Sequence, residues 1–186
     1  KLNKLGIIPG IKVDKGLNPL PGGGDVETFC SGLDGLVERA AKYYEQGARF
    51  AKWRAVLQIT EDGCPSKLSI QENAWGLARY ARSVQESGLV PIIEPEILMD
   101  GDHTIEKTAE VQEEVIKQVY IACQANGVFL EGTLLKPSMT VNGAECQTKA
   151  DPMKVAEMTI RTMERCVPAS VPGIVFLSGG LSEEAA

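Results

Sequence analysis

Residues that could perform chemistry recur along the sequence at a nearly constant spacing. Five mostly apolar segments carry a polar side chain at the same phase: Lys12, Lys52, Glu94, Lys136 and Ser178. Each lies about 42 residues after the one before, which is the length of one β-strand, one covering helix and their loops. The spacing therefore predicts that these side chains meet at one edge of a parallel sheet.

The residue types in this set suit the chemistry of an amine with a carbonyl group. Lysine is a poor nucleophile while protonated, and it is activated where it is desolvated or lies near another cation. Lys136 and Lys52 would crowd each other, and Glu94 could transfer the protons that carbinolamine formation and dehydration require. The pattern indicates a Schiff-base enzyme. The segment "VFLEGTLLKPSM" (128–139), taken alone, leaves open the alternative of a surface lysine at a strand end.

The other reactive groups of the sequence do not form a recognisable catalytic set. The single histidine, His103, lies in the loop "MDGDHT", and no Cys/His cluster is present, so we expect neither a metal nor another cofactor. We expect His103 to cap a helix or face solvent. Trp53 and Trp75 are expected in the core, and 19–27 ("PLPGGGDVE") is expected to be a flexible loop without a nucleotide-binding pattern.

Two features favour a substrate with anionic groups. The glycines of "FLSGG" (176–180) would let the backbone approach an anion, and the helix-like start "LSEEAA" would add a helix N-terminus. Alternate residues of a strand share one face, which places Arg54 beside Lys52, and Glu96 beside Glu94. Arg54 could hold a second anion, or it could form an ion pair with Glu94 or Glu96. Glu96 could contact the substrate or only balance the charge of Lys52.

The elements that must position these residues alternate between strands and helices. Strands are expected at 6–13, 48–57, 89–96, 128–136 and 173–178, and helices at 34–46, 69–87, 104–125 and 152–166. Expected N-caps are Asp34, Ser69 and Asp151, and expected helix stops are Gly47, Gly88 and Gly127. This order predicts an α/β fold with a parallel sheet, either open or closed as a (β/α)₈ barrel with its polar groups in the C-terminal mouth.

Composition excludes several classes of protein. The 186 residues are 44% hydrophobic and 24% charged, with a net charge of −6 and no block of like charge, so we expect no nucleic-acid partner. No apolar run has the roughly 18 residues that a membrane span needs. The five cysteines form no CxxC pair, which favours reduced thiols in a cytoplasmic compartment. The first residue is Lys1, and we expect the chain to start inside a longer protein.

Several of these segments closely resemble class I fructose-1,6-bisphosphate aldolases. "VFLEGTLLKPS" (128–138) is similar to the Schiff-base lysine motif of that family, and "GIKVDKG", "GARFAKWR", "VPIIEPEIL" and "FLSGG" resemble further family segments in the same order. The resemblance implies a (β/α)₈ barrel that is usually a homotetramer. It also implies reversible cleavage of fructose 1,6-bisphosphate into dihydroxyacetone phosphate and glyceraldehyde 3-phosphate, in glycolysis, gluconeogenesis or carbon fixation.

The resemblance also implies roles for individual residues. Lys136 matches the imine-forming lysine, Glu94 matches the acid/base for imine formation and hydrolysis, and Lys52 matches the lysine that assists at the carbinolamine. The remaining matches are to substrate-binding residues. They are Lys12, Arg54 towards the 6-phosphate, Glu96 next to Lys52, and Ser178, Gly179 and Gly180 around the 1-phosphate.

The sequence also departs from the family pattern. We expect 1–186 to be a single, incomplete barrel domain of about five βα units, from the third strand to the seventh, and to be unstable alone because its outer strands are unpaired. An aspartate of the first strand and a serine and arginine of the last would be missing. Two alternatives remain: a transaldolase-like enzyme, or a non-catalytic aldolase fragment or interaction module. Segments of plant-like character make the plastid the alternative compartment.

Overall fold

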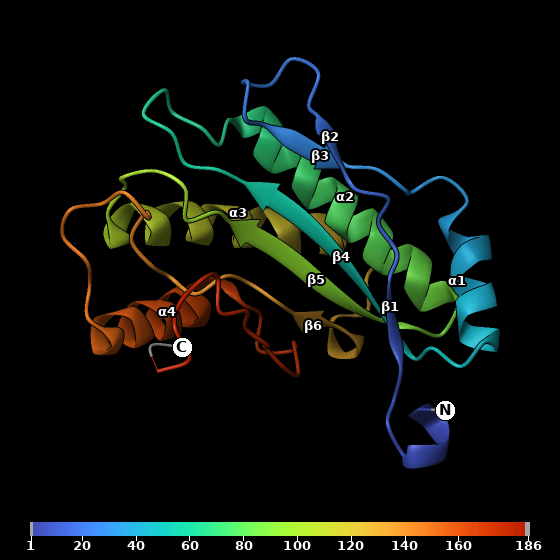
Figure 1. Ribbon diagram of the computed structural model, residues 1–186. Coiled ribbons are helices and arrows are strands. Elements are labelled where there is room, and N and C mark those ends of the chain that lie inside the picture. The colour runs from blue at the N-terminus through green and yellow to red at the C-terminus, as the bar shows by residue number, and fades with distance from the viewer. Residues whose placement is uncertain (1, 185–186) are drawn as a thin grey trace.

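A four-stranded parallel sheet forms the centre of the molecule in the computed structural model, which describes residues 2–184 (Figure 1). Its strands run in the order β1 (Gly10–Lys12), β4 (Phe50–Leu57), β5 (Val90–Ile97) and β6 (Leu134–Leu135). The register places Lys12 opposite Lys52, and Arg54 opposite Glu94. The predicted parallel sheet is confirmed, and its C-terminal edge carries the polar residues.

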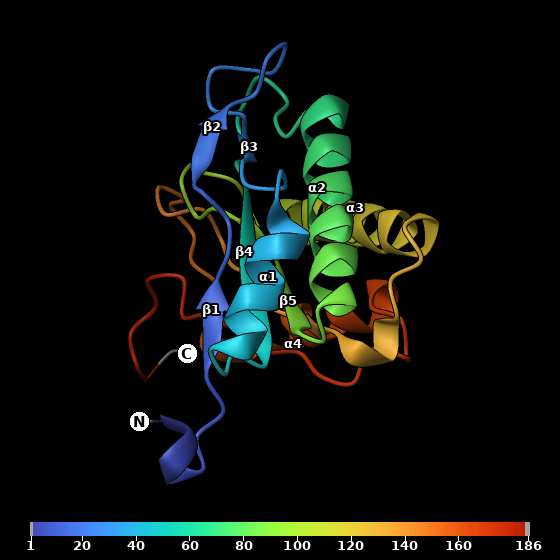
Figure 2. The ribbon, with the colours of Figure 1, turned by 90° about the vertical axis from the view of Figure 1, so that its right-hand side faces the viewer.

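The described residues form four α-helices, of which the last packs against the third. They are α1 (Leu36–Glu45), α2 (Lys67–Glu86), α3 (Ile105–Ala125) and α4 (Pro152–Cys166), with two short 3₁₀ helices at Leu2–Leu5 and Leu130–Gly132. Figure 2 shows α1, α2 and α3 on the same side of β1 and β4. The opposite face of the sheet is thereby left to the charged side chains.

Alternation along β4 separates the core from this charged face. Trp53 is buried against α2, where its ring stacks on that of Tyr80 at a centroid distance of 5.4 Å, while Lys52 and Arg54 project to the other face. The prediction that Trp53 belongs to the core is confirmed. The same prediction for Trp75 is wrong, since 51% of this residue is exposed. Trp75 follows Ala74 in α2, one step outside the buried stripe of that helix.

Three of the expected strands are much shorter than the sequence indicated, and the one expected at 6–13 is reduced to the three residues of β1. Within the expected strand 128–136, a 3₁₀ turn at Leu130–Gly132 leaves β6 only two residues, and Pro137 then lacks the N–H group that would continue the ladder. The expected strand at 173–178 is reduced to an isolated bridge between Leu135 and Ile174. The fifth unit therefore touches the sheet at one point.

The loop expected at 19–27 is present from residue 20 onwards, and it connects the two strands of an antiparallel hairpin. Its strands are β2 (Leu17–Pro19) and β3 (Thr28–Cys30). Glu27, which is buried, accepts hydrogen bonds from the amides of Gly24 at 2.9 Å and Ser66 at 2.6 Å, and from the Ser66 hydroxyl at 2.8 Å. The prediction of a flexible loop missed this carboxylate, which ties the hairpin to the start of α2.

The helix boundaries confirm part of the predicted capping. Asp151 caps α4 by accepting from the Lys154 amide at 2.9 Å, and glycines in the left-handed region follow α1, α2 and α3 at positions 47, 88 and 127. The other two N-caps were wrong. Ser66 rather than Ser69 caps α2, and Gly35 rather than Asp34 precedes α1. No helix among residues 2–184 has the length and apolar character to cross a membrane.

Candidate active site

One buried carboxylate lies between two lysines at the centre of the charged face. Lys136, immediately after β6, places its Nζ 2.6 Å from Glu94 Oε1, and Lys52 of β4 places its Nζ 2.7 Å from Glu94 Oε2. Glu94 comes from β5, the strand between them. The three groups predicted as a catalytic set are therefore brought into direct contact by the strand order.

The two contacts of Glu94 differ in kind. The contact with Lys136 is an aligned hydrogen bond, whereas that with Lys52 is an ion pair without such alignment, which leaves Oε2 with no aligned donor among the described residues. The Glu94 side chain is 3% exposed and each lysine side chain is 25% exposed. A carboxylate so far from water is stabilised by its two cationic neighbours.

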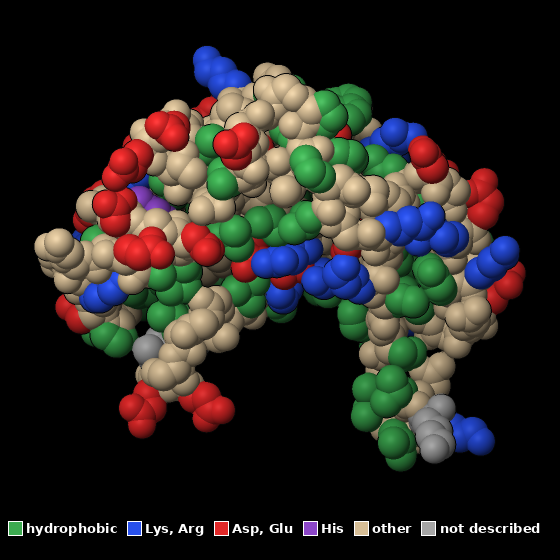
Figure 3. Space-filling model, turned by 45° about the horizontal axis from the view of Figure 1, so that its top comes forward, with side chains coloured by type: hydrophobic (Ala, Val, Ile, Leu, Met, Phe, Trp, Pro, Cys, Tyr) green, Lys and Arg blue, Asp and Glu red, His purple; other side chains and the backbone are tan. Residues whose placement is uncertain are grey.

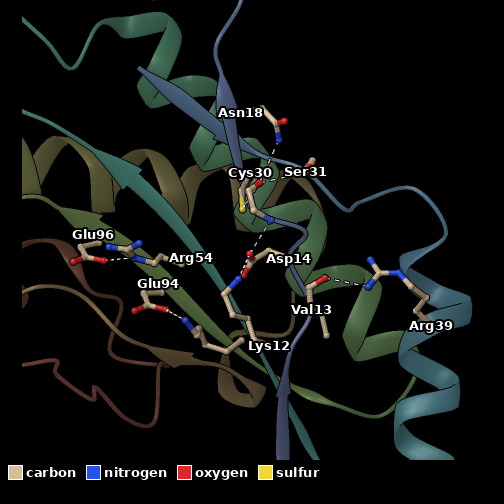
Figure 4. Close-up of polar contacts among 12 residues, drawn as sticks. Lys12, Val13, Asp14, Asn18, Cys30, Ser31, Arg39, Arg54, Glu94 and Glu96 are labelled. Atoms are coloured by element: carbon tan, nitrogen blue, oxygen red, sulfur yellow. Dashed lines mark hydrogen bonds and ion pairs between the residues drawn. The ribbon is translucent and has the colours of Figure 1, made fainter. Parts of the chain in front are cut away.

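A second ion pair lies beside this trio. Arg54 Nε donates to Glu96 Oε2 across the gap between β4 and β5, and the two side chains face each other in Figure 4. This hydrogen bond raises the pKa of Arg54, and the nearby carboxylates add to the effect although burial opposes it. Of the two alternatives for Arg54, the ion pair is the one present. Glu96 therefore balances Arg54, whereas Lys52 is balanced by Glu94.

At the outer strand of the sheet, Lys12 lies at the end of β1 and forms an ion pair with Asp14. Asp14 Oδ1 also accepts from the Gly16 amide at 3.2 Å, while its buried Oδ2 has no partner among residues 2–184. The Cys30 thiol lies nearby, and burial together with the charge of Asp14 raises its pKa to about 12. In the space-filling view, Lys and Arg side chains gather beside carboxylates on this face (Figure 3).

The predicted phosphate segment approaches the site from the C-terminal end of the chain. Ser178 and Gly179 share a cleft of about 140 Å³ with Glu96 and Ser138, and Gly180 follows at a positive φ of 91°. The Leu181 amide donates to the Ser178 carbonyl at 3.0 Å, which closes a turn. The expected helix is not found at 181–184, while 185–186 lie outside the described residues.

Of the two alternatives for His103, capping is wrong, because Thr104 caps α3, and the residue is partly exposed to solvent. Both ring nitrogens of His103 are buried without a hydrogen-bond partner among the described residues. Burial lowers its pKa, while the charges of Asp102 and Glu145 oppose this shift and Lys149 adds to it. Within the described part of the chain, no three His, Cys, Asp or Glu side chains gather as metal ligands would.

Two residues that support the site were missed from the sequence. Gln112 of α3 and Ser138, two positions after Lys136, are both buried and hydrogen-bonded to each other. Gln112 interrupts the apolar stripe of its helix. A buried polar side chain in such a stripe must find partners, so the interruption was a usable signal.

Comparison with known proteins agrees with this geometry. The family model described as "Fructose-bisphosphate aldolase class-I" matches residues 1–186. The chain is 57% identical over 183 residues to the chloroplastic fructose-bisphosphate aldolase 3 of Arabidopsis thaliana, covering 98% of this chain and 46% of that protein. It is 56% identical over 185 residues to the cytosolic aldolase 4 of the same plant, covering 100% of this chain and 47% of the relative.

A solved structure gives the same result. The fructose-bisphosphate aldolase of Plasmodium falciparum, crystallised with TRAP and a small-molecule inhibitor, superimposes with a TM-score of 0.96 and 55% identity over 99% of this chain and 53% of that one. The chain spans about half the length of the relatives it matches. The likeness confirms the expected (β/α)₈-barrel fold class. The chain belongs to the class I fructose-bisphosphate aldolase family.

Proposed function

We propose that the protein containing this chain is a Schiff-base lyase that reversibly cleaves fructose 1,6-bisphosphate into dihydroxyacetone phosphate and glyceraldehyde 3-phosphate. The observation that carries the proposal is the contact of Glu94 with two lysines, at 2.6 Å from Lys136 and 2.7 Å from Lys52. In this arrangement Lys136 is the nucleophile, Glu94 is the proton acceptor and Lys52 is a fixed positive charge. Each lysine lies within hydrogen-bonding distance of the Glu94 carboxylate. Residues 1–186 would form part of one catalytic barrel domain.

The first step is attack by Lys136 on the substrate carbonyl carbon. Lys136 must lose a proton to become a nucleophile, and Glu94 Oε1 is placed to accept it directly. As Lys136 becomes neutral, Lys52 remains beside Glu94. The attack forms the C–N bond to Nζ and breaks the π bond of the carbonyl group. One of the two protons left on Nζ then moves to the former carbonyl oxygen, which gives a neutral carbinolamine with a hydroxyl group.

The second step removes that hydroxyl group. Glu94, now protonated, returns its proton to the carbinolamine oxygen, water leaves, and the imine of Lys136 forms. The ammonium of Lys52 would stabilise negative charge on the departing oxygen. The protonated imine then withdraws electrons from the carbon–carbon bond to be broken, which is the role that covalent catalysis by lysine serves.

Substrate binding would use the groups around this trio. Arg54 would take the 6-phosphate by exchanging Glu96 for the phosphate, since Arg pairs with either anion in the same geometry. Lys12, at the outer strand, would line the same end of the site. The backbone around Ser178, Gly179 and Gly180 would hold the 1-phosphate.

Assembly and compartment also belong to the proposal. We expect a homotetramer, as the family resemblance implies, and a cytoplasmic location with the plastid as the alternative. The relatives include both cytosolic and chloroplastic aldolases.

The proposal is tested by measuring triose phosphate release from fructose 1,6-bisphosphate by the protein at its natural length. Lys136→Met should abolish cleavage. Lys107→Met, which removes a lysine from a surface ion pair with Glu110, is the matched control and should retain it. Cleavage that survives Lys136→Met, or an unaltered protein that folds without any cleavage, would exclude the proposed reaction.

A further inference from the structure

The backbone that follows Lys136 has lost its sheet partner. β6 ends at Leu135, the Lys136 amide makes the last bond of the ladder to the Ile93 carbonyl at 2.7 Å, and Pro137 has no N–H to continue it. A lysine at such a strand end would swing with the chain unless other groups hold the next residues. Ser138 is 4% exposed, so some part of the molecule does hold it.

The Ser138 side chain takes the place of the missing ladder bond. Its hydroxyl oxygen accepts from the Ile97 amide at 3.3 Å, which links the chain after Lys136 to the end of β5. The same oxygen accepts from Gln112 Nε2 at 3.0 Å. Because Glu94 also lies in β5, the hydrogen bond between Ile97 and Ser138 joins the strand that carries the carboxylate to the backbone that carries Lys136.

Gln112 binds this segment at both ends of its amide. Nε2 also donates to the Ser138 carbonyl at 3.0 Å, and Oε1 accepts from the Thr140 hydroxyl at 2.6 Å. The reversed amide would set its oxygen against a carbonyl oxygen, so this orientation alone satisfies every group. Gln112 is 1% exposed, so each hydrogen bond that its amide failed to make would be costly.

Two hydroxyl groups of the helices also bind the chain after Ser138. Together with Gln112 they form a clamp, which we define as Gln112, Thr108 and Thr159 bound to residues 138–141. Thr159 of α4 accepts from the Thr140 amide at 2.9 Å, and Thr108 of α3 donates to the Val141 carbonyl at 2.7 Å. Among Gln112, Thr108 and Thr159, Gln112 is the one that bonds Ser138. It donates to both the backbone carbonyl and the side-chain hydroxyl of Ser138.

We propose that Gln112 is a positioning residue that, through Ser138, holds Lys136 in line with Glu94 for imine formation. The inference rests on the proposed function. Gln112 does not touch the substrate, so its loss should slow the reaction of Lys136 while substrate binding by the phosphate groups is retained. A misplacement of the nucleophile by about 1 Å can cost on the order of 100-fold in rate.

The test compares Gln112→Met with Gln118→Met in the protein at its natural length. Both variants make the same chemical change on α3, and Gln118 lies outside the clamp. The rate of borohydride-trapped adduct formation with dihydroxyacetone phosphate is measured per active site in single turnovers. We expect Gln112→Met to slow trapping by about tenfold or more, and to change the KM for dihydroxyacetone phosphate by less than about twofold. Gln118→Met should match the unaltered protein in both.

A purely structural role would give a different result: a lower melting temperature and fewer active sites, but an unchanged rate per site. Equal rates for the two variants would overturn the inference. If Gln112→Met does not fold, Thr140→Val removes the donor to Gln112 Oε1 and should slow trapping in the same direction. In a double-mutant cycle with Ser138→Ala, the rate losses should be non-additive, and strict additivity would contradict action through Ser138.

The unaltered protein separates the two possible failures. If it forms no adduct at Lys136, the proposed function fails and the inference falls with it. If it forms the adduct at the rate shown by Gln112→Met, only the inference fails.

Discussion

Lys136 Nζ lies 2.6 Å from Glu94 Oε1, across the gap between β6 and β5. The distance allows direct proton transfer without an intervening water molecule. It results from the parallel register, in which Leu135 lies opposite Ile93, so that the next residue of each strand reaches the same level. The geometry of the sheet thus places a proton acceptor next to the lysine.

Glu94→Gln should reduce cleavage by about 100-fold to 10,000-fold, because the amide cannot accept the Lys136 proton. Glu113→Gln is the matched control. Glu113 also lies between two cations, Lys117 at 3.1 Å and Arg165 at 2.9 Å, but on the surface between α3 and α4. The rates are compared in single turnovers. Equal effects of the two substitutions would mean that loss of charge, rather than loss of the base, explains the result.

Arg54→Ala should weaken the binding of fructose 1,6-bisphosphate more than that of fructose 1-phosphate, which lacks the 6-phosphate. A hydrogen bond to a charged group contributes about 1.5–3 kcal/mol, so KM for the bisphosphate should rise roughly tenfold to 100-fold. Arg161→Ala, at an exposed arginine of α4, is the control. A similar rise for both sugars would show that Arg54 does not contact the 6-phosphate.

Glu27→Gln should destabilise the protein at neutral pH and have little effect in acid. Burial opposes ionisation of Glu27, but the hydrogen bonds from Ser66 and Gly24 outweigh it and lower its pKa below the ordinary 4.5. The carboxylate therefore stabilises the folded state above pH 4.5, and this stabilisation is lost as the pH falls through the lowered value. Thermal unfolding measured across this range, with exposed Asp25→Asn of the same hairpin as control, checks the prediction. A destabilisation that is independent of pH would contradict it.

The imidazole of His103 should titrate below 6.5, because burial disfavours its charged form. As the pH falls below 6.5, the unfolded chain takes up a proton before the folded one does, so stability should decrease. The titration is followed by NMR of the ring resonances, with His103→Gln as the control that removes this pH dependence. A titration midpoint at or above 6.5 would refute the account of this loop.

Much of the sheet and of its charged face could be predicted from the sequence. The spacing of Lys12, Lys52, Glu94 and Lys136 reflects the length of a βα unit, which local pattern fixes. The partners of these side chains could not be predicted, because contact between strands depends on register. Arg54 therefore had two candidate carboxylates until the structure paired it with Glu96.

The remaining differences have the same origin in tertiary context. Glu27 looked like one more charge in a glycine-rich loop, because its hydrogen bonds with Ser66 join residues 39 positions apart in the sequence. Ser138 and Gln112 are likewise separated in sequence, and their bond depends on how α3 packs against the end of β6. Secondary-structure propensity and hydrophobic periodicity are local properties of the sequence, so they do not predict such long-range contacts.

The central claim is that Lys136 forms the imine, and borohydride reduction in the presence of dihydroxyacetone phosphate tests it most directly. Intact mass and peptide mapping of the protein at its natural length should locate one reduced adduct on Lys136, and Lys136→Met should abolish it. An adduct on Lys52 instead, or no adduct on a folded protein, would contradict the account.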